Sequence, residues 1–498
     1  MSLLVQKYGG TSIGDTQRIG ALAERVKASR ATGDDIVVVV SAMSRETDRL
    51  AVLYEKIGGN DARESDFVLA SGEQVAAGLT AAALQAIGVS ARSFNGAQAG
   101  IITDNAHGKA RIIDISTRTL RDALEVGQTP VITGFQGITA DGAITTLGRG
   151  GSDTTAVALA AGLAADECQI YTDVNGIYTT DPRVCKKARL LKEVTFEEML
   201  EMASLGSRVL QIRAVEFAGK YRVPLRVLSS FNATSTGTLI IYEEENMEKP
   251  VVTGVAFNRA EAKITVTGVP DQPGAAYKLL APLAEGNINV DMILQNIGDD
   301  KRTSLSFTVH SDEFATALKI SKQAAVAVNA VNIIADEKIG KVSIVGIGMK
   351  SHVGVASTMF RTLAENNINI QMISTSEIKI SVVIDESRLD DAVRALHDAF
   401  DLGKEREMNR LELELTNILK GMYENAPDNN TVTIIHLFGI KYAAELQNPD
   451  ISIQRIATNA AKKSYYTEIR KRIQLAKYVK FNSDGETYIT EINNLIKN

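Results

Sequence analysis

The chain has 498 residues, of which 45% are hydrophobic and 23% charged; this is ordinary for a globular protein and predicts about three domains of ~100–200 residues each. The net charge of −6 gives no global reason to expect nucleic-acid binding, and two cysteines are too few for a disulfide framework or a paired metal site, which favours a reducing cytoplasm. Because the N-terminus starts directly with an alternating strand and no apolar run approaches about 18 residues, we expect neither a signal peptide nor a membrane span.

The first β-loop-α unit places a lysine and two glycines at the end of a strand. Residues 2–7 are expected to form a short apolar strand, which runs directly into Lys-Tyr-Gly-Gly-Thr-Ser at 7–12. An amphipathic helix is expected at 16–29. Lys7 in this place can meet phosphate charge, while Gly9 and Gly10 let backbone N–H groups approach a ligand. The alternative is a turn with a surface lysine.

The next unit repeats this rhythm. An apolar strand at 35–40 ends in a loop of small hydroxyl residues that includes Ser41 and Thr47. Open α/β sheets place their ligands at such carboxyl ends of strands. A helix is expected at 67–84, and it carries Glu73, which has no obvious partner in the sequence; the alternative for Glu73 is a solvated helix charge.

Three further strands and a helix complete the pattern. We expect strands at 131–135, 169–172 and 225–228 and a helix at 197–210. The β-loop-α alternation predicts one α/β domain over residues 1–242 with a mostly parallel sheet.

The stretch from Gly148 to Ala156 has the composition of a phosphate-binding turn, and it is followed by a run of small helix-forming residues. Its glycines let the backbone approach a ligand, and a helix beginning at Ser152 or Asp153 would direct free N–H groups and a positive dipole end at it. Arg149 adds a charge that can reach phosphate oxygens, and Asp153 suits a bound Mg²⁺. The stretch therefore predicts a nucleotide site with a metal; the alternative is a glycine turn with an N-cap aspartate.

An internal repeat follows an acidic linker, which with the start of the regulatory part spans 243–260. Leu-Ala-Glu-Gly-Asn-Ile-Asn at 283–289 returns as Leu-Ala-Glu-Asn-Asn-Ile-Asn at 363–369. The two units, 261–335 and 336–403, each have the pattern of a βαββαβ domain, and such domains pair side by side and leave ligand sites between them.

The composition changes near residue 404, as if the tail at 404–498 had a different origin. A helix is expected at 405–423, a β-like run at 431–438, and two short helices at 453–460 and 464–475 with the spacing of a helix-turn-helix. From Arg455 to Lys480 there are eight basic residues and one acidic residue. The tail therefore predicts DNA binding; the alternative is a small helical interaction domain with a solvated basic face. In the DNA hypothesis the residues nearest the bases are Tyr465, Tyr466 and Glu468, and those nearest the phosphates are Lys462, Lys463, Arg470, Lys471 and Arg472.

Five motifs resemble those of aspartate kinases in order and spacing, and the repeats resemble that family's paired ACT domains. The motifs are Lys-Tyr-Gly-Gly-Thr-Ser at 7–12, Val-Ser-Ala-Met at 40–43, Ser-Gly-Glu-Gln at 71–74, Gly-Arg-Gly-Gly-Ser-Asp-Thr-Thr-Ala at 148–156 and Tyr-Thr-Asp-Val-Asn-Gly-Ile-Tyr-Thr-Thr-Asp-Pro-Arg at 171–183. The resemblance covers residues 1 to about 403 and not the tail. It implies an amino-acid-kinase fold, with helices on both sides of a mostly parallel sheet, followed by two ferredoxin-like ACT domains; a small, mainly helical domain is expected after them.

The resemblance implies ATP-dependent phosphorylation of the β-carboxylate of L-aspartate. By position, Lys7 would contact the transferring phosphate and Asp153 would act with Mg²⁺–ATP. The residues implied for aspartate binding are Thr47, Glu73, Phe135, Arg149 and Ser152. Those implied for nucleotide binding are Gly9, Gly10, Ser41, Thr172, Asp173, Tyr178, Arg183 and Arg208. Phosphoryl transfer depends on positioning and charge neutralisation, and a carboxylate nucleophile needs no general base.

Two residues depart from the family pattern: Asn175 stands where aspartate is common and Arg208 where lysine is usual. Arginine keeps the charge but not the geometry, which bears on ATP affinity and not on the reaction type. An acetylglutamate, glutamate or uridylate kinase is an alternative, but those enzymes lack the starting motif combined with tandem ACT units. A DNA-binding regulator that only senses amino acids is another, and the intact set of Lys7, Glu73, Arg149 and Asp153 argues against it.

The ACT pair is expected to bind lysine, threonine or both as effectors. The residues implied for this site are Asp291, Gln295, Asn369 and Ile370. We also expect a homo-oligomer. Met247, at the boundary between kinase and ACT parts, is a candidate start for a shorter regulatory subunit; the alternative is an ordinary linker methionine.

Overall fold

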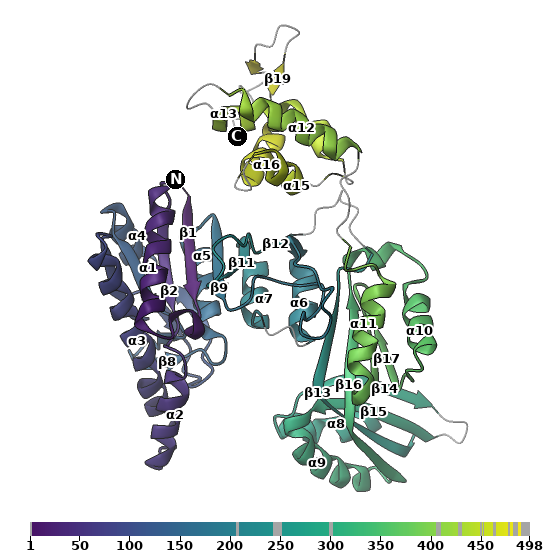
Figure 1. Ribbon diagram of the computed structural model, residues 1–498. Coiled ribbons are helices and arrows are strands. Elements are labelled where there is room, and N and C mark those ends of the chain that lie inside the picture. The colour runs from purple at the N-terminus through teal and green to yellow at the C-terminus, as the bar shows by residue number, and fades with distance from the viewer. Residues whose placement is uncertain are drawn as a thin grey trace. The chain divides into compact units, whose positions relative to one another are not determined.

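The computed structural model describes residues 2–205, 209–242, 251–297, 302–404, 410–426, 431–448, 451, 453–461, 465–476, 479–481 and 487–489. The chain divides into two compact units (Figure 1). The first comprises Met1–Tyr242 and Val251–Gly403, and the second comprises Glu243–Pro250 and Lys404–Asn498.

An eight-stranded sheet forms the centre of the first 242 residues. Its order is β10-β12-β11-β9-β1-β2-β6-β3, and of these neighbours only β11 and β12 are antiparallel, so the expected mostly parallel sheet is confirmed. In sheet order the strands are Glu193–Thr195, Thr238–Ile241, Leu225–Ser229, Glu167–Thr172, Leu3–Tyr8, Asp35–Val40, Thr129–Thr133 and Ala91–Phe94.

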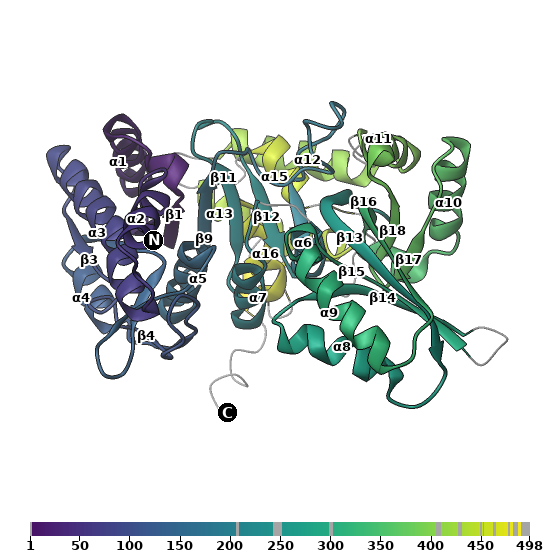
Figure 2. The same ribbon diagram turned by 90° about the horizontal axis from the view of Figure 1, so that it is seen from below.

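Helices cover both faces of this sheet because its strands are apolar on both faces. In β2, Val37 and Val39 join one core cluster, which includes residues of α4, α5 and α7, whereas Ile36, Val38 and Val40 join another, with α1 and α3. This layering can be followed in Figure 2. The helices are α1 (Thr16–Ala31), α2 (Glu46–Lys56), α3 (Ala62–Ala86), α4 (Arg118–Glu125), α5 (Gly151–Leu163), α6 (Phe196–Ser204) and α7 (Ile212–Tyr221), with a 3-10 turn, η1, at Gly10–Ile13.

A second, four-stranded sheet lies beside α3 and leads into the glycine-rich stretch. Its order is β5-β4-β7-β8, with strands Ile112–Ile115, Ile101–Thr103, Gln136–Ile138 and Ile144–Thr146. Because β8 ends at Thr146, the chain runs from this sheet directly into Gly148 and α5.

The repeats at 254–399 share one six-stranded antiparallel sheet, of order β14-β15-β13-β16-β18-β17, and the predicted ferredoxin-like pair is confirmed. The first repeat's core includes α8 and α9, and the second's includes α10 and α11. The elements are β13 (Gly254–Pro270), α8 (Ala275–Glu285), β14 (Val290–Ile297), β15 (Arg302–His310), α9 (Phe314–Ala327), β16 (Asn332–Val345), α10 (Val355–Glu365), β17 (Met372–Thr375), β18 (Lys379–Asp385) and α11 (Leu389–Ala399).

The C-terminal unit is mainly helical, as expected, and the predicted pair of short helices is present as α15 and α16. Its elements are α12 (Arg410–Glu424), α13 (Thr431–Lys441), α14 (Ala443–Leu446), α15 (Ile453–Ala460), α16 (Tyr465–Leu475), β19 (Val479–Phe481) and β20 (Thr487–Ile489). The predicted β-like run at 431–438 is wrong, because the segment forms α13. Its β-branched residues favour a strand, but Ile435 and Phe438, three residues apart, are buried in one core with Ile469, and tertiary packing overrides propensity.

Three further expectations need correction. The helix expected at 197–210 is α6 at Phe196–Ser204, and Val209 and Leu210 are not helical. The predicted strand at 131–135 ends at Thr133, because Phe135 takes the left-handed conformation with φ of 69°. The helix expected at 67–84 begins earlier, at Ala62, and this helix, α3, is also long and apolar enough to qualify as a membrane span, with a mean hydropathy of 1.3 over its most apolar window. Its residues Ala70, Ala76 and Leu84 are fully buried, so composition alone does not separate it from a core helix of an α/β domain.

Candidate active site

The carboxyl ends of four neighbouring parallel strands bring the predicted site segments together. Tyr8 of β1 is opposite Val40 of β2 and Tyr171 of β9, and Val40 is opposite Thr133 of β6. The loops after these strands therefore meet at one edge of the sheet, where α/β proteins bind their ligands. Lys7, Ser41, Phe135 and Thr172 all belong to these strand ends or loops.

Lys7 and Asp153 face each other at the head of α5. The Lys7 Nζ lies 2.5 Å from Asp153 Oδ1, and both residues are buried. Among the described residues Asp153 Oδ1 has no partner in hydrogen-bond geometry, so this contact is an ion pair without a directed hydrogen bond. A buried cation at a strand end, next to a carboxylate in the first turn of a helix, suits a site that receives phosphate charge.

The glycine-rich turn has the geometry that its sequence predicts. Gly148 and Gly150 have φ of 77° and 73°, values that favour glycine. Helix α5 begins at Gly151, one residue before the expected start, and no side chain of the described residues caps its N-terminus. Its positive dipole end is therefore available to an anion. Arg149, in this turn, is exposed and has no ion-pair partner among the described residues.

Glu73 is a buried carboxylate with one oxygen unpaired. It is 3% exposed, its Oε1 accepts from the Ala42 N–H at 3.0 Å, and its Oε2 has no partner among the described residues. Burial raises the pKa of Glu73 to about 7, against the lowering effect of the Ala42 hydrogen bond. The alternative of a solvated helix charge is wrong, and the free oxygen is suited to an ammonium ligand.

Three other predicted substrate residues surround this edge. Ser152 packs against Gly134 so closely that a Cβ at Gly134 would lie 2.5 Å from the Ser152 Oγ. The left-handed Phe135 donates its N–H to Thr155 Oγ1 at 3.1 Å, which ties this loop to α5. Thr47 lies in the first turn of α2 and is half-buried.

Gly9 and Gly10 pack the first loop against its neighbours. Gly10 permits a close approach, because a Cβ there would lie 2.8 Å from the Ala42 carbonyl oxygen. The Gly9 N–H donates to Tyr171 O at 3.3 Å. It is therefore not free to donate to a ligand, contrary to the expectation. Ser41 likewise gives its N–H to Tyr8 O at 3.1 Å.

The residues after β9 that were predicted to bind the nucleotide mostly contact their sequence neighbours. Thr172 donates to Asp173 Oδ1 at 3.2 Å, and Tyr178 accepts from Asn175 Nδ2 at 3.4 Å. The Arg183 side chain is 90% exposed and its guanidinium is held by Asp181. That interaction lowers the pKa of Asp181. Arg208 lies outside the described residues.

Sequence reasoning missed the groups that hold the glycine-rich turn from behind. Arg213 of α7 donates to Leu147 O and to Ala110 O, each at 2.9 Å. Asp66 of α3 accepts from Thr146 and from the loop that contains His107. These residues are 41 to 103 positions apart in the sequence from the segments they contact, so no local sequence pattern predicts the contacts.

The predicted effector residues are distributed over both repeats. Asp291 and Gln295 lie on β14, one edge strand of the sheet, and Asn369 and Ile370 precede β17, the other edge strand. Asp291 contacts the Nζ of Lys341, which is also 3.0 Å from Glu261 Oε1. Burial lowers the pKa of Lys341, but the two carboxylates outweigh that effect and the pKa stands above its usual value. Asp291 is therefore already paired, which the sequence did not predict.

Comparisons with known proteins agree with this architecture. The chain matches the model of the amino acid kinase family at residues 2–229, that of the ACT domain at 264–332 and 342–400, and that of an HTH-like domain at 412–482. The fold and the site thus define an amino acid kinase that carries two ACT domains.

Individual relatives show which kind of amino acid kinase the chain resembles. An aspartate kinase of Pseudomonas fluorescens is 59% identical over 406 residues, which is 81% of this chain and 98% of the relative. An aspartokinase of Corynebacterium glutamicum is 48% identical over 413 residues, with 82% and 98% covered. The solved structure of E. coli aspartokinase III in complex with aspartate and ADP has a TM-score of 0.65 and 25% identity, covering 80% of this chain and 99% of that one. The chain belongs to the aspartate kinase family and is an ATP-dependent kinase.

Proposed function

We propose that the enzyme transfers the γ-phosphoryl group of Mg²⁺–ATP to the β-carboxylate of L-aspartate, giving ADP and 4-phospho-L-aspartate in the cytoplasm. The observation that carries the site assignment is the unpaired buried oxygen of Glu73, whose other oxygen accepts from the Ala42 N–H in the loop after β2. A buried charge without a partner costs stability, and such groups persist where a ligand completes them.

Aspartate is recognised by its two ends. Glu73 takes the α-ammonium group and Arg149 takes the α-carboxylate, which leaves the β-carboxylate directed at the phosphate. Thr47, Phe135 and Ser152 line the pocket. Because the substrate carboxylate is itself the nucleophile, the protein contributes positioning and charge neutralisation.

Lys7 acts on the nucleotide side. Its ammonium neutralises charge on the transferring phosphoryl group, and the N-terminus of α5 adds a positive dipole end. Ser41, Thr172, Asp173, Tyr178, Arg183 and Arg208 are the proposed nucleotide contacts, with Gly9 and Gly10 shaping the loop.

The site fits Mg²⁺ that arrives with the nucleotide. The described residues contain no group of three or more acidic, histidine or cysteine side chains able to hold a metal by themselves. Asp153 offers one buried carboxylate at the phosphate end, and Mg²⁺ is typically held by one or two carboxylates together with substrate phosphates. When bound, the ion neutralises phosphate charge.

Lysine, threonine or both are the proposed feedback effectors, bound by Asp291 and Gln295 of one repeat and by residues around Asn369 and Ile370 of the other. The E. coli aspartokinase III structure with lysine and aspartate, which has a TM-score of 0.64 and 25% identity to this chain, supports lysine as a candidate. The sheet order separates the two residue pairs by four strands, which favours a homo-oligomer in which repeats of two chains complete each site.

The buried carboxylate of Glu198 offers a route from effector to active site. It is 2% exposed, its Oε2 accepts from the Thr195 N–H and Oγ1, each at 3.0 Å, and its Oε1 accepts from Thr253 at 2.7 Å and from the Ile347 N–H at 3.0 Å. Glu198 of α6 thereby joins the kinase part to the loop after β16. A shift of that loop in the regulatory sheet is transmitted to α6.

The test is a coupled assay of ADP formation with aspartate, ATP and Mg²⁺, repeated with lysine and threonine, separately and together. We expect aspartate-dependent turnover that at least one of these amino acids inhibits. Turnover with glutamate or acetylglutamate in preference to aspartate would contradict the substrate assignment, and turnover insensitive to both amino acids would contradict the effector assignment alone.

DNA binding is proposed as a second activity, of residues 404–498, because the HTH-like match at 412–482 covers α15 and α16. The predicted contact between Glu468 and a DNA base is withdrawn. The Glu468 carboxylate lies 2.8 Å from His436 Nε2 and accepts from Lys471 Nζ at 3.4 Å, so it is not free to accept from a base. The ring of Tyr465 packs against Tyr423. Lys471 is exposed and stays a proposed phosphate contact, whereas Arg472 is half-buried and its Nη2 lies 3.4 Å from His436 Nε2. Lys462, Lys463 and the side chains of Tyr466 and Arg470 lie outside the described residues.

The tail can be tested by fluorescence anisotropy of residues 404–498 on duplex DNA, since this segment has its own core. About five phosphate contacts would give a log–log salt slope of roughly −4 to −5. No binding at low salt, or binding without salt dependence, would reject the DNA proposal and favour a protein-contact surface.

Met247 also lies outside the described residues, so the shorter regulatory subunit remains a prediction. Expression of the native gene with Met247→Leu should remove a short product if Met247 is a start. A single full-length band from both genes would identify a linker methionine.

A further inference from the structure

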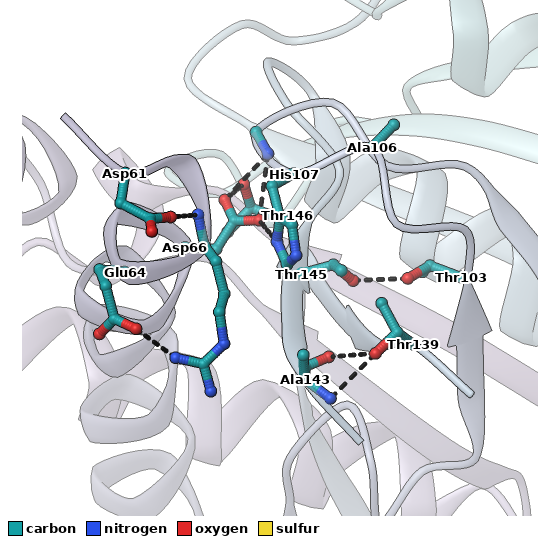
Figure 3. Close-up of polar contacts among 12 residues, drawn as sticks. Asp61, Glu64, Asp66, Thr103, Ala106, His107, Thr139, Ala143, Thr145 and Thr146 are labelled. Atoms are coloured by element: carbon teal, nitrogen blue, oxygen red, sulfur yellow. Dashed lines mark hydrogen bonds and ion pairs between the residues drawn. The ribbon is translucent and has the colours of Figure 1, made fainter. Parts of the chain in front are cut away.

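Asp66 is a fully buried carboxylate that accepts hydrogen bonds from three residues near the start of the glycine-rich turn. It is 0% exposed, and it accepts from His107 Nδ1 at 2.8 Å, from the Gly108 N–H at 3.0 and 3.1 Å, and from Thr146 Oγ1 at 2.5 Å. Figure 3 shows Asp66 on its helix with His107 and Thr146 converging on it. A carboxylate without solvent retains its charge only when such donors surround it.

The His107 loop is closed by hydrogen bonds of its own and is joined to the strand that leads into the active-site turn. Asp104 Oδ1 closes the loop by accepting from the N–H groups of Ala106 at 3.2 Å and Arg111 at 3.0 Å. The Ala110 N–H donates to Thr146 O at 2.9 Å. Thr146 is therefore held twice, by its side chain through Asp66 and by its carbonyl through the loop.

The glycine-rich turn begins two residues after Thr146 and rests on the same loop. A Cβ on Gly148 would lie 3.2 Å from Gly108 O, so the turn and the loop are in close contact. Arg149 follows directly. Any displacement of the His107 loop moves the backbone that carries Arg149.

The helix that carries Asp66 also carries Glu73. The two are seven residues apart, which is about two helical turns, so both project from the same side of α3. Between them, Ala70 O accepts from Gln136 Nε2 at 2.9 Å, which fixes the middle of the helix to β7. One rigid helix thus sets the place of Glu73 and, through Asp66, that of the turn with Arg149.

We propose that Asp66 and His107 are positioning residues for aspartate binding, which hold the glycine-rich turn at the spacing from Glu73 that one amino acid requires. This inference rests on the proposed roles of Glu73 and Arg149. The two ends of aspartate are separated by a fixed number of bonds, and a misplacement of about 1 Å in such a clamp can cost roughly 10²-fold in rate. Neither residue needs to touch the substrate for this effect.

The cluster has the residue types of an acid–histidine–hydroxyl relay, but its contacts exclude that role. The Thr146 hydroxyl donates to Asp66 and not to His107, so Thr146 is not a hydroxyl that His107 activates. Both Asp66 oxygens are already occupied by donors. The reaction itself needs no base, because its nucleophile is a carboxylate.

The test uses the position of the donor atom on residue 107. In asparagine the amide nitrogen is bonded to Cγ, as Nδ1 is in histidine, whereas in glutamine it lies one bond further along. His107→Asn therefore keeps the donor to Asp66 and His107→Gln displaces it. Asp66→Asn and Thr146→Val remove the acceptor charge and one donor; if either fails to fold, the two variants at His107 carry the test, because its side chain is 18% exposed.

The readouts are the KM for aspartate, the KM for ATP, kcat, and the thermal midpoint of each variant. We expect His107→Gln and Asp66→Asn to raise the KM for aspartate roughly tenfold or more, the effect of losing a hydrogen bond to a charged group, with the KM for ATP within about twofold. His107→Asn should restore most of the aspartate affinity. Variants at His107 with equal KM values, or with equal changes for both substrates, would overturn the inference and leave a purely structural cluster.

Glu73→Gln separates this inference from the proposed function. If Glu73→Gln raises the KM for aspartate while His107→Gln and Asp66→Asn do not, only the positioning role is wrong. If Glu73→Gln leaves the KM for aspartate unchanged, the proposed substrate contacts are wrong and the positioning role falls with them.

Discussion

The candidate active site of the kinase region and the Lys341 cluster of the regulatory sheet differ in how their buried charges are paired. In the kinase region, Glu73 Oε2 has no partner among the described residues, and Lys7 and Asp153 share an ion pair without a directed hydrogen bond. In the regulatory sheet, the buried Lys341 contacts both Glu261 and Asp291. In the active site, the unpaired oxygen of Glu73 and the ammonium of Lys7 can interact with charges on the substrates. In the regulatory sheet, an effector that binds Asp291 must replace the contact between Asp291 and Lys341.

This contrast predicts the largest effect for Lys7, whose charge matters most where negative charge shifts during transfer. Lys7→Ala should lower kcat by roughly 10²-fold or more and change the KM for aspartate far less. Steady-state kinetics with both substrates varied give the two numbers. Near-normal kcat in a folded variant would remove Lys7 from the phosphate side of the site.

A smaller effect is expected at the effector site, because inhibition is a coupling free energy between distinct sites. Asp291→Ala should relieve inhibition by roughly 5- to 150-fold, judged by the effector concentration that halves activity, and leave the uninhibited kcat nearly unchanged. Gln295→Ala removes the second proposed effector contact on the same strand and should act in the same direction. An Asp291→Ala enzyme with wild-type inhibition would contradict the proposed contact.

The smallest effect tests whether Lys341 competes with the effector. Because Asp291 is about half exposed, its pair with Lys341 is weak, and removing the ammonium should strengthen inhibition only about two- to fivefold. Lys341→Met is best combined with Glu261→Gln, so that no buried carboxylate is left unpaired. Weaker inhibition in the double variant, with an unchanged thermal midpoint, would show that Lys341 supports the effector and does not compete with it.

Much of this architecture could be predicted from the sequence, because the relevant signals are local. The strand at 35–40 is continuous and apolar, and the structure gives it the same bounds. The glycine-rich turn, the two repeats and the helix pair α15–α16 also follow from patterns a few residues long. Lys7 and Asp153 could each be predicted to lie at a phosphate site, because α/β folds bind ligands at strand ends and helix starts.

The remaining features depend on contacts between distant segments. The left-handed Phe135 and the helical α13 are set by packing against α5 and α16, which no local propensity encodes. Asp66 and His107 are 41 residues apart, and Lys341 and Asp291 are 50 apart. Their pairing requires the completed fold.

The most direct test of the account is the pH dependence of kcat/KM for aspartate, since this quantity reports ionisations of the free enzyme. The Glu73 carboxyl has a pKa of about 7 because of its burial, and only its ionised form attracts the substrate ammonium. Below this pKa the protonated, neutral form dominates and aspartate binds weakly; above it the charged form dominates.

We therefore predict that kcat/KM for aspartate rises about tenfold per pH unit below pH 7 and levels off above it, while Glu73→Gln is flat over the same range and lower at pH 8. The variant removes the titrating group with little change of shape, so it is the matched control. A wild-type profile without this rise, or a Glu73→Gln enzyme that keeps it, would contradict the claim that an unpaired buried carboxylate marks the aspartate site.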